Sequence, residues 1–175
     1  MLGRDADSIR IGTLLLFLIT CHLTCAADRN ADSVKSADFI LVVKSTRTMT
    51  LYSGHTVLKS YKVALSRDSV GPKERAGDHK TPEGDYAIDA KNAHSQFHLA
   101  LHISYPNAAY REYARRLGVS PGGDVEIHGL PDGYAWLGDT QRLVDWTDGC
   151  IAVTNPEIEE IWKLVRTGTP VEMRP

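Results

Sequence analysis

The sequence has few cysteines, no cluster of positive charge and no long apolar run. Three of its 175 residues are cysteines, which is too few for a disulfide scaffold. The 20 Lys and Arg residues are offset by 22 Asp and Glu residues, and this balance, without a basic cluster, argues against nucleic acid as a partner. We find no internal repeat or low-complexity segment, and the length fits one globular domain.

The longest apolar run lies near the N-terminus, in a segment typical of an export signal. Residues 11–21 would form about 16 Å of helix, against a hydrocarbon core of about 30 Å. Basic residues precede this run and small residues close it at 25–27. We expect a signal peptide at 1–27, a polar leader at 28–36 and export to the periplasm or cell envelope. The alternative is an uncleaved signal that anchors the protein in the membrane.

Signal cleavage would leave Cys150 as the one cysteine of the mature chain. Exported proteins usually pair their thiols, and a lone thiol cannot pair within its own chain. Cys150 is therefore either a buried inert residue or a nucleophile.

The remaining chain is predicted to be mainly β, or α+β, with largely antiparallel strands and two helices. Residues 66–84 form the longest irregular stretch, and such loops often line binding sites. Apolar alternation and branched residues favour strands at 38–44, 49–52, 57–65, 85–90, 96–104, 124–128 and 171–173.

Each predicted helix has recognisable end signals. The first spans 108–117, with Asn107 as N-cap, Gly118 at its end and an apolar stripe along one face. The second spans 156–167, with Asn155 as N-cap and Pro156 in its first turn.

Two residues could supply nucleophilic chemistry. Gly149 permits a tight turn before Cys150 that would aim both backbone N–H groups at one carbonyl oxygen and stabilise its developing charge. His128 ends a short strand 22 positions upstream, and an imidazole with a pKa of ~6.5 can take a thiol proton. The alternatives are a structural cysteine beside apolar Ile151 and a surface histidine.

Three segments resemble motifs of the L,D-transpeptidase (YkuD-type) catalytic domain. They are Ile127-His128-Gly129, Thr147-Asp148-Gly149-Cys150-Ile151 and Thr81-Pro82-Glu83-Gly84. The resemblance extends over nearly the whole chain after the leader and implies a catalytic domain at 37–175. Its fold would be the β-sandwich of that family with two peripheral helices.

The resemblance also implies an activity on the stem peptides of peptidoglycan. Cys150 would attack a diaminopimelate carbonyl to form a thioester, which an amine or water resolves. His128 would act as base and then acid, and the Gly149 amide would help form the oxyanion hole. Gly129, Thr147 and Asp148 would contact substrate, with no metal or organic cofactor.

Two positions depart from the family pattern and leave alternatives open. Asp148 replaces the usual second motif histidine, and Ala152 replaces an arginine. The variant motif resembles a compact branch of the family in which some members are thought to release murein-linked lipoprotein by hydrolysis. The alternatives are therefore such a murein hydrolase, or a murein-binding domain without catalysis. A papain-like peptidase is disfavoured because its cysteine would lie early in the chain, on a long helix.

Other candidate sites carry less weight. His94, His98 and His102 are four residues apart, and each such step spans about 13 Å on a strand, so they cannot share one metal ion. Tyr134 and Trp136 follow His128 and could form a lid, although core packing is the simpler interpretation.

Overall fold

The computed structural model describes residues 35–175, to which every structural statement below refers. The signal peptide expected at 1–27, and all but the end of the leader expected at 28–36, lie outside these residues. No helix in the described part of the chain is both long and apolar enough to cross a membrane.

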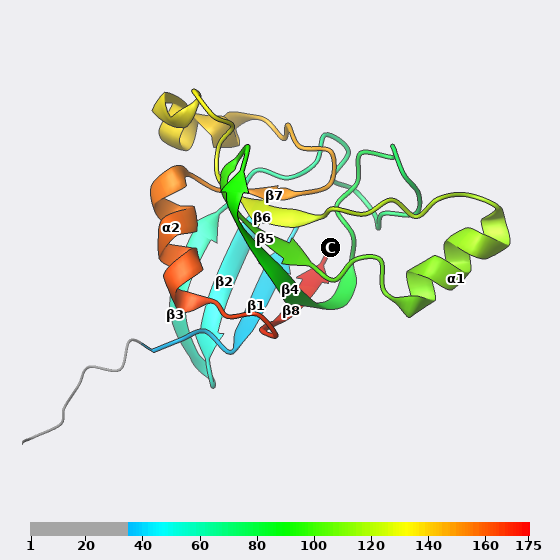
Figure 1. Cartoon of the computed structure of the whole chain (residues 1–175), viewed down its shortest axis with the longest axis horizontal. Coiled ribbons are helices and arrows are strands. Elements are labelled where there is room, and N and C mark those ends of the chain that lie inside the picture. The colour runs from blue at the N-terminus through cyan, green and yellow to red at the C-terminus, as the bar shows by residue number, and fades with distance from the viewer. Residues whose placement is uncertain (1–34) are drawn as a thin grey trace, which may run out of the picture. The chain divides into compact units, whose positions relative to one another are not determined.

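Eight strands form one curled sheet in the order β3-β2-β1-β8-β4-β5-β6-β7 (Figure 1). Strand β4 joins the two halves, because residues 84–87 pair with β8 and residues 88–95 pair with β5. The strands are β1 Phe39–Val43, β2 Thr48–Ser53, β3 Thr56–Lys62, β4 Gly84–Ser95, β5 His98–Ile103, β6 Glu126–His128, β7 Ile151–Ala152 and β8 Pro170–Arg174. The mainly β class predicted from the sequence is confirmed.

Two parallel pairs interrupt the antiparallel pattern. The C-terminal strand β8 lies between β1 and β4 and runs parallel to β1, while β6 and β7 run parallel at the other end of the sheet. The core between the two halves consists of large apolar side chains, among them Ile40, Met49, Leu51, Leu101, Ile103, Ile127, Ile151, Ile158 and Ile161.

Helix α2 (Asn155–Leu164) begins one residue earlier than predicted. Its N-cap is Thr154, whose backbone N–H and hydroxyl both donate to the Glu157 carboxylate, so the prediction of Asn155 as the cap is wrong. The Asn155 side chain instead accepts a hydrogen bond from the Leu130 amide at 2.8 Å. The helix also ends three residues before the predicted end, because the Leu164 carbonyl accepts a hydrogen bond from the Ala37 amide.

Helix α1 (Ala108–Leu117) has the predicted bounds and caps. Asn107 accepts from the Tyr110 amide at 3.0 Å, and Gly118 closes the helix with a φ of 67°. Ala114 is the one buried residue of this helix, so most of its apolar stripe is at least partly exposed. The reason is its position: α1 projects from the sheet on a long connection (Figure 1).

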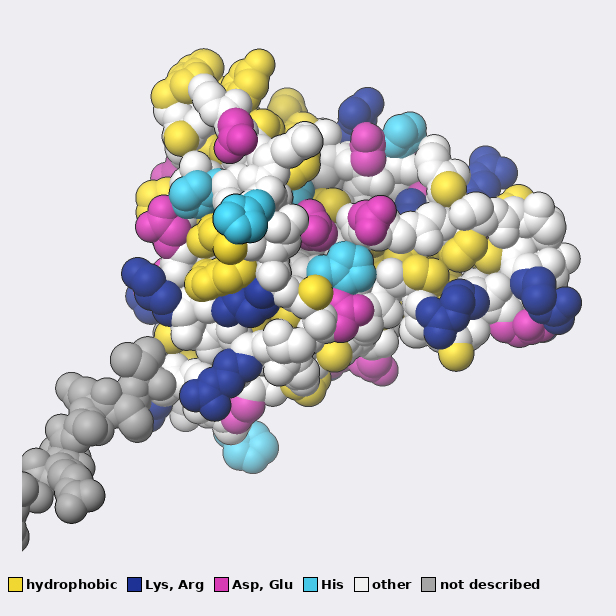
Figure 2. Space-filling model, in the orientation of Figure 1, with side chains coloured by type: hydrophobic (Ala, Val, Ile, Leu, Met, Phe, Trp, Pro, Cys, Tyr) yellow, Lys and Arg dark blue, Asp and Glu magenta, His cyan; other side chains and the backbone are white. Residues whose placement is uncertain are grey.

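Residues 129–146, for which the sequence analysis names no strand or helix, contain a short helical segment. A short 3₁₀ helix, η1 (Ala135–Leu143), is interrupted at Gly138, where φ is 46° and ψ is −130°. Trp136 is 77% exposed on it, so core packing is the wrong interpretation for this residue. Figure 2 shows apolar side chains gathered on the corner of the molecule where this helix lies in Figure 1.

Candidate active site

His128 lies at the end of β6 and is 2% exposed. Its neighbour Ile127 points into the core, so strand alternation places His128 on the opposite face. The imidazole packs against two aromatic rings, with centroid distances of 4.4 Å to Phe97 and 5.7 Å to Trp146. The histidine is therefore held rigidly and shielded from water, and it is not the surface residue considered as an alternative.

The surroundings of His128 favour the neutral imidazole. Burial lowers its pKa to about 4, and the hydrogen bond with the Gly129 carbonyl opposes this shift only in part. Nδ1 lies 2.7 Å from that carbonyl oxygen and donates its proton to it. Nε2 is then unprotonated, so the ring is ready to accept a proton at neutral pH.

Cys150 directly precedes β7, which pairs in parallel with β6. The register aligns Ile127 with Ile151 and His128 with Ala152. Extending it by one residue brings Cys150 opposite Glu126, on the face that carries His128 and away from the core. Parallel pairing thus brings Cys150, the residue before β7, next to the strand that ends at His128, 22 positions upstream.

The thiol of Cys150 is partly exposed and protonated at neutral pH. Burial raises its pKa to about 11, and the carboxylates of Glu126, Asp124 and Asp148 add to the shift. The sulfur donates a weak hydrogen bond to the Asp124 carbonyl at 3.5 Å. A thiol in this state needs a base before it can act as a nucleophile.

The turn before the cysteine requires glycine at position 149. Its φ is 142°, and a Cβ there would lie 3.0 Å from the Lys80 carbonyl oxygen. Thr147 is buried, and its hydroxyl donates to the Cys150 carbonyl at 2.8 Å. The Gly149 amide faces the same hydroxyl at 3.4 Å. Thr147 therefore shapes the turn, while the Gly149 amide is only weakly engaged.

Gly129 is required by close packing. A Cβ there would lie 2.7 Å from the Asn155 side-chain oxygen and 2.9 Å from the Phe97 carbonyl. Its amide faces the carbonyl oxygens of Phe97 and Leu99 at 3.1 and 3.2 Å. Gly129 thus fixes the chain immediately after His128.

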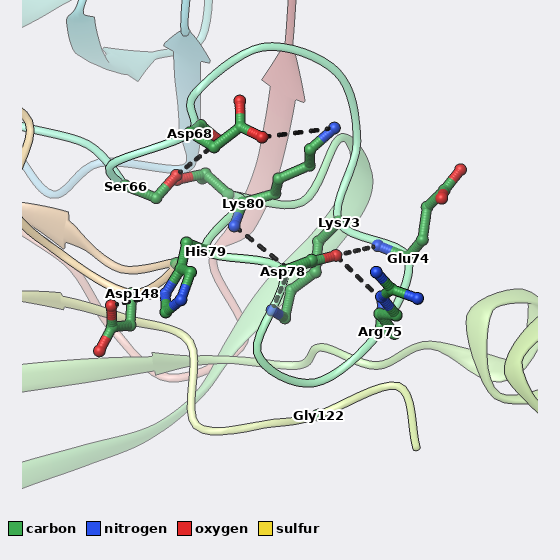
Figure 3. Close-up of polar contacts among 12 residues, drawn as sticks. Ser66, Asp68, Lys73, Glu74, Arg75, Asp78, His79, Lys80, Gly122 and Asp148 are labelled. Atoms are coloured by element: carbon green, nitrogen blue, oxygen red, sulfur yellow. Dashed lines mark hydrogen bonds and ion pairs between the residues drawn. The ribbon is translucent and has the colours of Figure 1, made fainter. Parts of the chain in front are cut away.

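Asp148 lies at the rim of the site and contacts residues that sequence reasoning did not connect to it. Its carboxylate forms an ion pair with Arg67 at 3.1 Å. The same carboxylate lies 2.9 Å from His79 Nδ1, and both of these side chains are drawn in Figure 3. His79 and Asp124 both have non-glycine backbones with positive φ, of 51° and 54°. Such strained positions are enriched at functional sites, and both residues contact the segment around Cys150.

An apolar cleft adjoins the histidine. It measures about 350 Å³ and is lined in part by Trp146, whose ring also contacts His128. Tyr134 lines it, whereas Trp136 does not. Of the two aromatic residues considered as a lid, Tyr134 therefore lines this cleft, and Trp136 is 77% exposed.

The three evenly spaced histidines do not lie in one cluster of candidate ligands. His98 Nε2 contacts Glu159 at 2.8 Å and His102 Nδ1 contacts Asp89 at 2.5 Å. Residues 35–175 contain no group of three or more His, Cys, Asp or Glu side chains arranged to hold a metal ion.

Comparison with known proteins gives a consistent result. Residues 37–173 match the family model for the YkuD L,D-transpeptidase catalytic domain. YafK of Escherichia coli (strain K12) is 32% identical over 144 residues, which cover 78% of this chain and 50% of YafK. The chain thus spans about half the length of the curated relatives it matches.

Solved structures share the fold. The helical cell shape determining protein Pgp2 from Campylobacter jejuni (K307A mutant) superposes with a TM-score of 0.61 at 24% identity, covering 80% of this chain and 47% of that one. An L,D-transpeptidase from Mycobacterium smegmatis gives 0.52 at 16% identity, covering 79% and 59%. Since the family model extends over nearly all of the described residues, the chain belongs to the L,D-transpeptidase (YkuD) catalytic-domain family.

Proposed function

We propose that the protein is a peptidoglycan L,D-transpeptidase that uses Cys150 as its nucleophile. The observation that supports this proposal is the parallel pairing of β6 with β7, because Cys150 directly precedes β7 and β6 ends at His128, whose imidazole is buried and neutral. Membership of the family supports the substrate class, the stem peptides of peptidoglycan. The protein would act in the periplasm or cell envelope.

The first half-reaction forms an acyl-enzyme. His128 Nε2 accepts the Cys150 proton as the sulfur attacks a diaminopimelate carbonyl. The amides of Gly149 and Cys150 stabilise the negative charge on the carbonyl oxygen. The carbon–nitrogen bond then breaks, and the terminal D-alanine leaves with the proton from His128.

The second half-reaction returns the enzyme to its resting state. An amine from another stem peptide, or water, loses a proton to His128 and attacks the thioester. The sulfur leaves and regains the proton. Asp148, which pairs with Arg67 at the rim, would contact charged groups of the substrate, and Thr147 and Gly129 would support the site from within.

A murein hydrolase that releases a linked lipoprotein is the second candidate, and one observation favours it. Ala152 stands where the family usually has arginine. It is fully buried, and its backbone amide and carbonyl both form hydrogen bonds with the backbone of Ala64. The anion-binding group expected there is missing, so the leaving group or acceptor can differ from that of other members.

Product analysis tests the proposal. Wild-type protein incubated with purified murein should release D-alanine and form new cross-links, whereas Cys150→Ala and His128→Ala should fold and do neither. Water-cleaved products alone would favour the hydrolase. Murein binding without any product, unchanged in Cys150→Ala, would contradict the enzyme and favour a binding domain.

A further inference from the structure

Lys73 and Asp78 form a buried ion pair in the long loop before β4. Their Nζ and Oδ1 atoms lie 2.7 Å apart, and the side chains are 5% and 9% exposed. Asp78 Oδ2 also accepts from the amides of Glu74 and Arg75 at 2.7 and 3.0 Å, and Oδ1 accepts from the Lys80 amide at 3.2 Å (Figure 3). The carboxylate thus joins both ends of the 73–80 loop.

Asp78 stays ionised in this setting. Burial by itself would raise its pKa, but the Lys73 ammonium and the three backbone amides outweigh burial and lower the pKa to about 2. The ion pair with Lys73 and the three hydrogen bonds from backbone amides therefore persist at neutral pH.

The 73–80 loop packs closely against the turn that precedes Cys150. The Lys80 carbonyl oxygen lies 3.0 Å from the position that a Cβ on Gly149 would occupy, and Lys73 Nζ lies 4.0 Å from it. The next residue outward, His79, contacts Asp148. Two consecutive loop residues therefore contact the two residues that precede Cys150.

Lys73 also contacts the segment on the other side of Cys150. Its Cε lies 3.3 Å from the Cβ position of Gly122, and the Ala76 amide donates to the Ser120 carbonyl at 2.8 Å. The same segment continues to Asp124, whose carbonyl accepts the thiol hydrogen bond. Lys73 therefore lies between the two segments that border the cysteine.

We propose that the Lys73–Asp78 pair is a positioning element that holds the turn at Gly149 and Cys150 so that the backbone amides of these two residues are aimed at the oxyanion. The inference rests on the proposed function, and neither side chain is assigned a contact with substrate. Attack on a carbonyl needs these amides, whereas alkylation of the thiol does not. Loss of the pair should slow the first reaction and spare the second.

The test compares two reactions of Cys150 in the full-length protein. A carbapenem acylates the thiol, forming a sulfur–carbonyl bond while the ring nitrogen leaves with the proton, and iodoacetamide alkylates it. In Lys73→Met and Asp78→Asn we expect acylation to slow by about tenfold or more, while alkylation stays within about threefold of wild type. Lys73→Arg keeps the charge and should restore most of the acylation rate.

Lys44 provides a matched control. Its ammonium is equally buried, pairs with Glu83 at 2.9 Å and donates to the Gly71 and Thr81 carbonyls, so it ties the same long loop without reaching Gly149. Lys44→Met should lower Tm and leave the ratio of acylation to alkylation unchanged.

Each outcome decides the matter. A lowered ratio in Lys73→Met and Asp78→Asn alone supports the positioning role. An unchanged ratio in both, or an equal fall in Lys44→Met, overturns it. Wild-type protein that is alkylated but never acylated overturns the proposed function, and the positioning role with it.

Discussion

The imidazole of His128 lies against the ring of Phe97, with 4.4 Å between the ring centroids. This contact covers a histidine whose burial lowers its pKa to about 4. Removing the ring should admit water, so in Phe97→Ala the pKa of His128 should rise by about one unit or more. An NMR titration of the His128 ring measures this. In Phe39→Ala, which removes a ring that contacts Tyr52, the pKa should stay at about 4.

The low pKa of His128 also makes stability depend on pH. An unfolded histidine takes up its proton at about pH 6.5 and the folded one at about pH 4, so between these values the unfolded state binds more protons. The free energy of unfolding should therefore fall as pH falls through this window, by about 3 kcal/mol.

Denaturant titrations at pH 7 and pH 4 test this dependence. His128→Gln should lose most of the His128 contribution, whereas His55→Gln, which changes an exposed residue, should keep it. An equal pH dependence in wild type and His128→Gln would contradict the assignment.

The raised pKa of Cys150 predicts an unreactive resting thiol. Iodoacetamide should alkylate Cys150 slowly at pH 7, and the rate should keep rising towards pH 10, because the thiol pKa is about 11. The same cysteine in urea should reach its full rate about two units lower, near its ordinary pKa. Peptide masses separate Cys150 from the two N-terminal cysteines. A rate that levels off below pH 8 in the folded protein would show a thiolate at rest.

Gly129 should tolerate no side chain. A Cβ would lie 2.7 Å from Asn155 and 2.9 Å from a Phe97 carbonyl, so Gly129→Ala should lower the free energy of unfolding by about 2 kcal/mol or more. Gly123→Ala is the matched control, because its Cβ meets nothing within 4 Å and its effect should be under about 0.5 kcal/mol. Equal effects in the two variants would contradict this packing argument.

Local signals in the sequence were sufficient for many elements. A run of branched apolar residues predicted β1, alternating apolar residues predicted β5, and Asn107 with Gly118 predicted both ends of α1. The N-cap of α2 was misplaced because Thr154 and Asn155 are both good caps, and the choice depends on a distant amide, that of Leu130.

Long-range contacts could not be predicted in this way. Nothing local places β8 between β1 and β4, because the pairing partners lie far away in the sequence. The motifs pointed to His128 and Cys150, but their shared face depends on the parallel register of β6 and β7. The contact of His79 with Asp148 arises from the fold of the 66–84 loop, for which the sequence predicted only an irregular path.

The central claim is that Cys150 becomes acylated with the help of His128. Its most direct test is the intact mass of the protein after acid quenching of a reaction with a murein stem tetrapeptide. The account predicts a mass increase equal to the tetrapeptide less its terminal D-alanine, located on Cys150 by peptide mapping, absent in Cys150→Ala and strongly reduced in His128→Gln. D-Alanine release by Cys150→Ala at the wild-type rate, or acylation at any other residue, would contradict it.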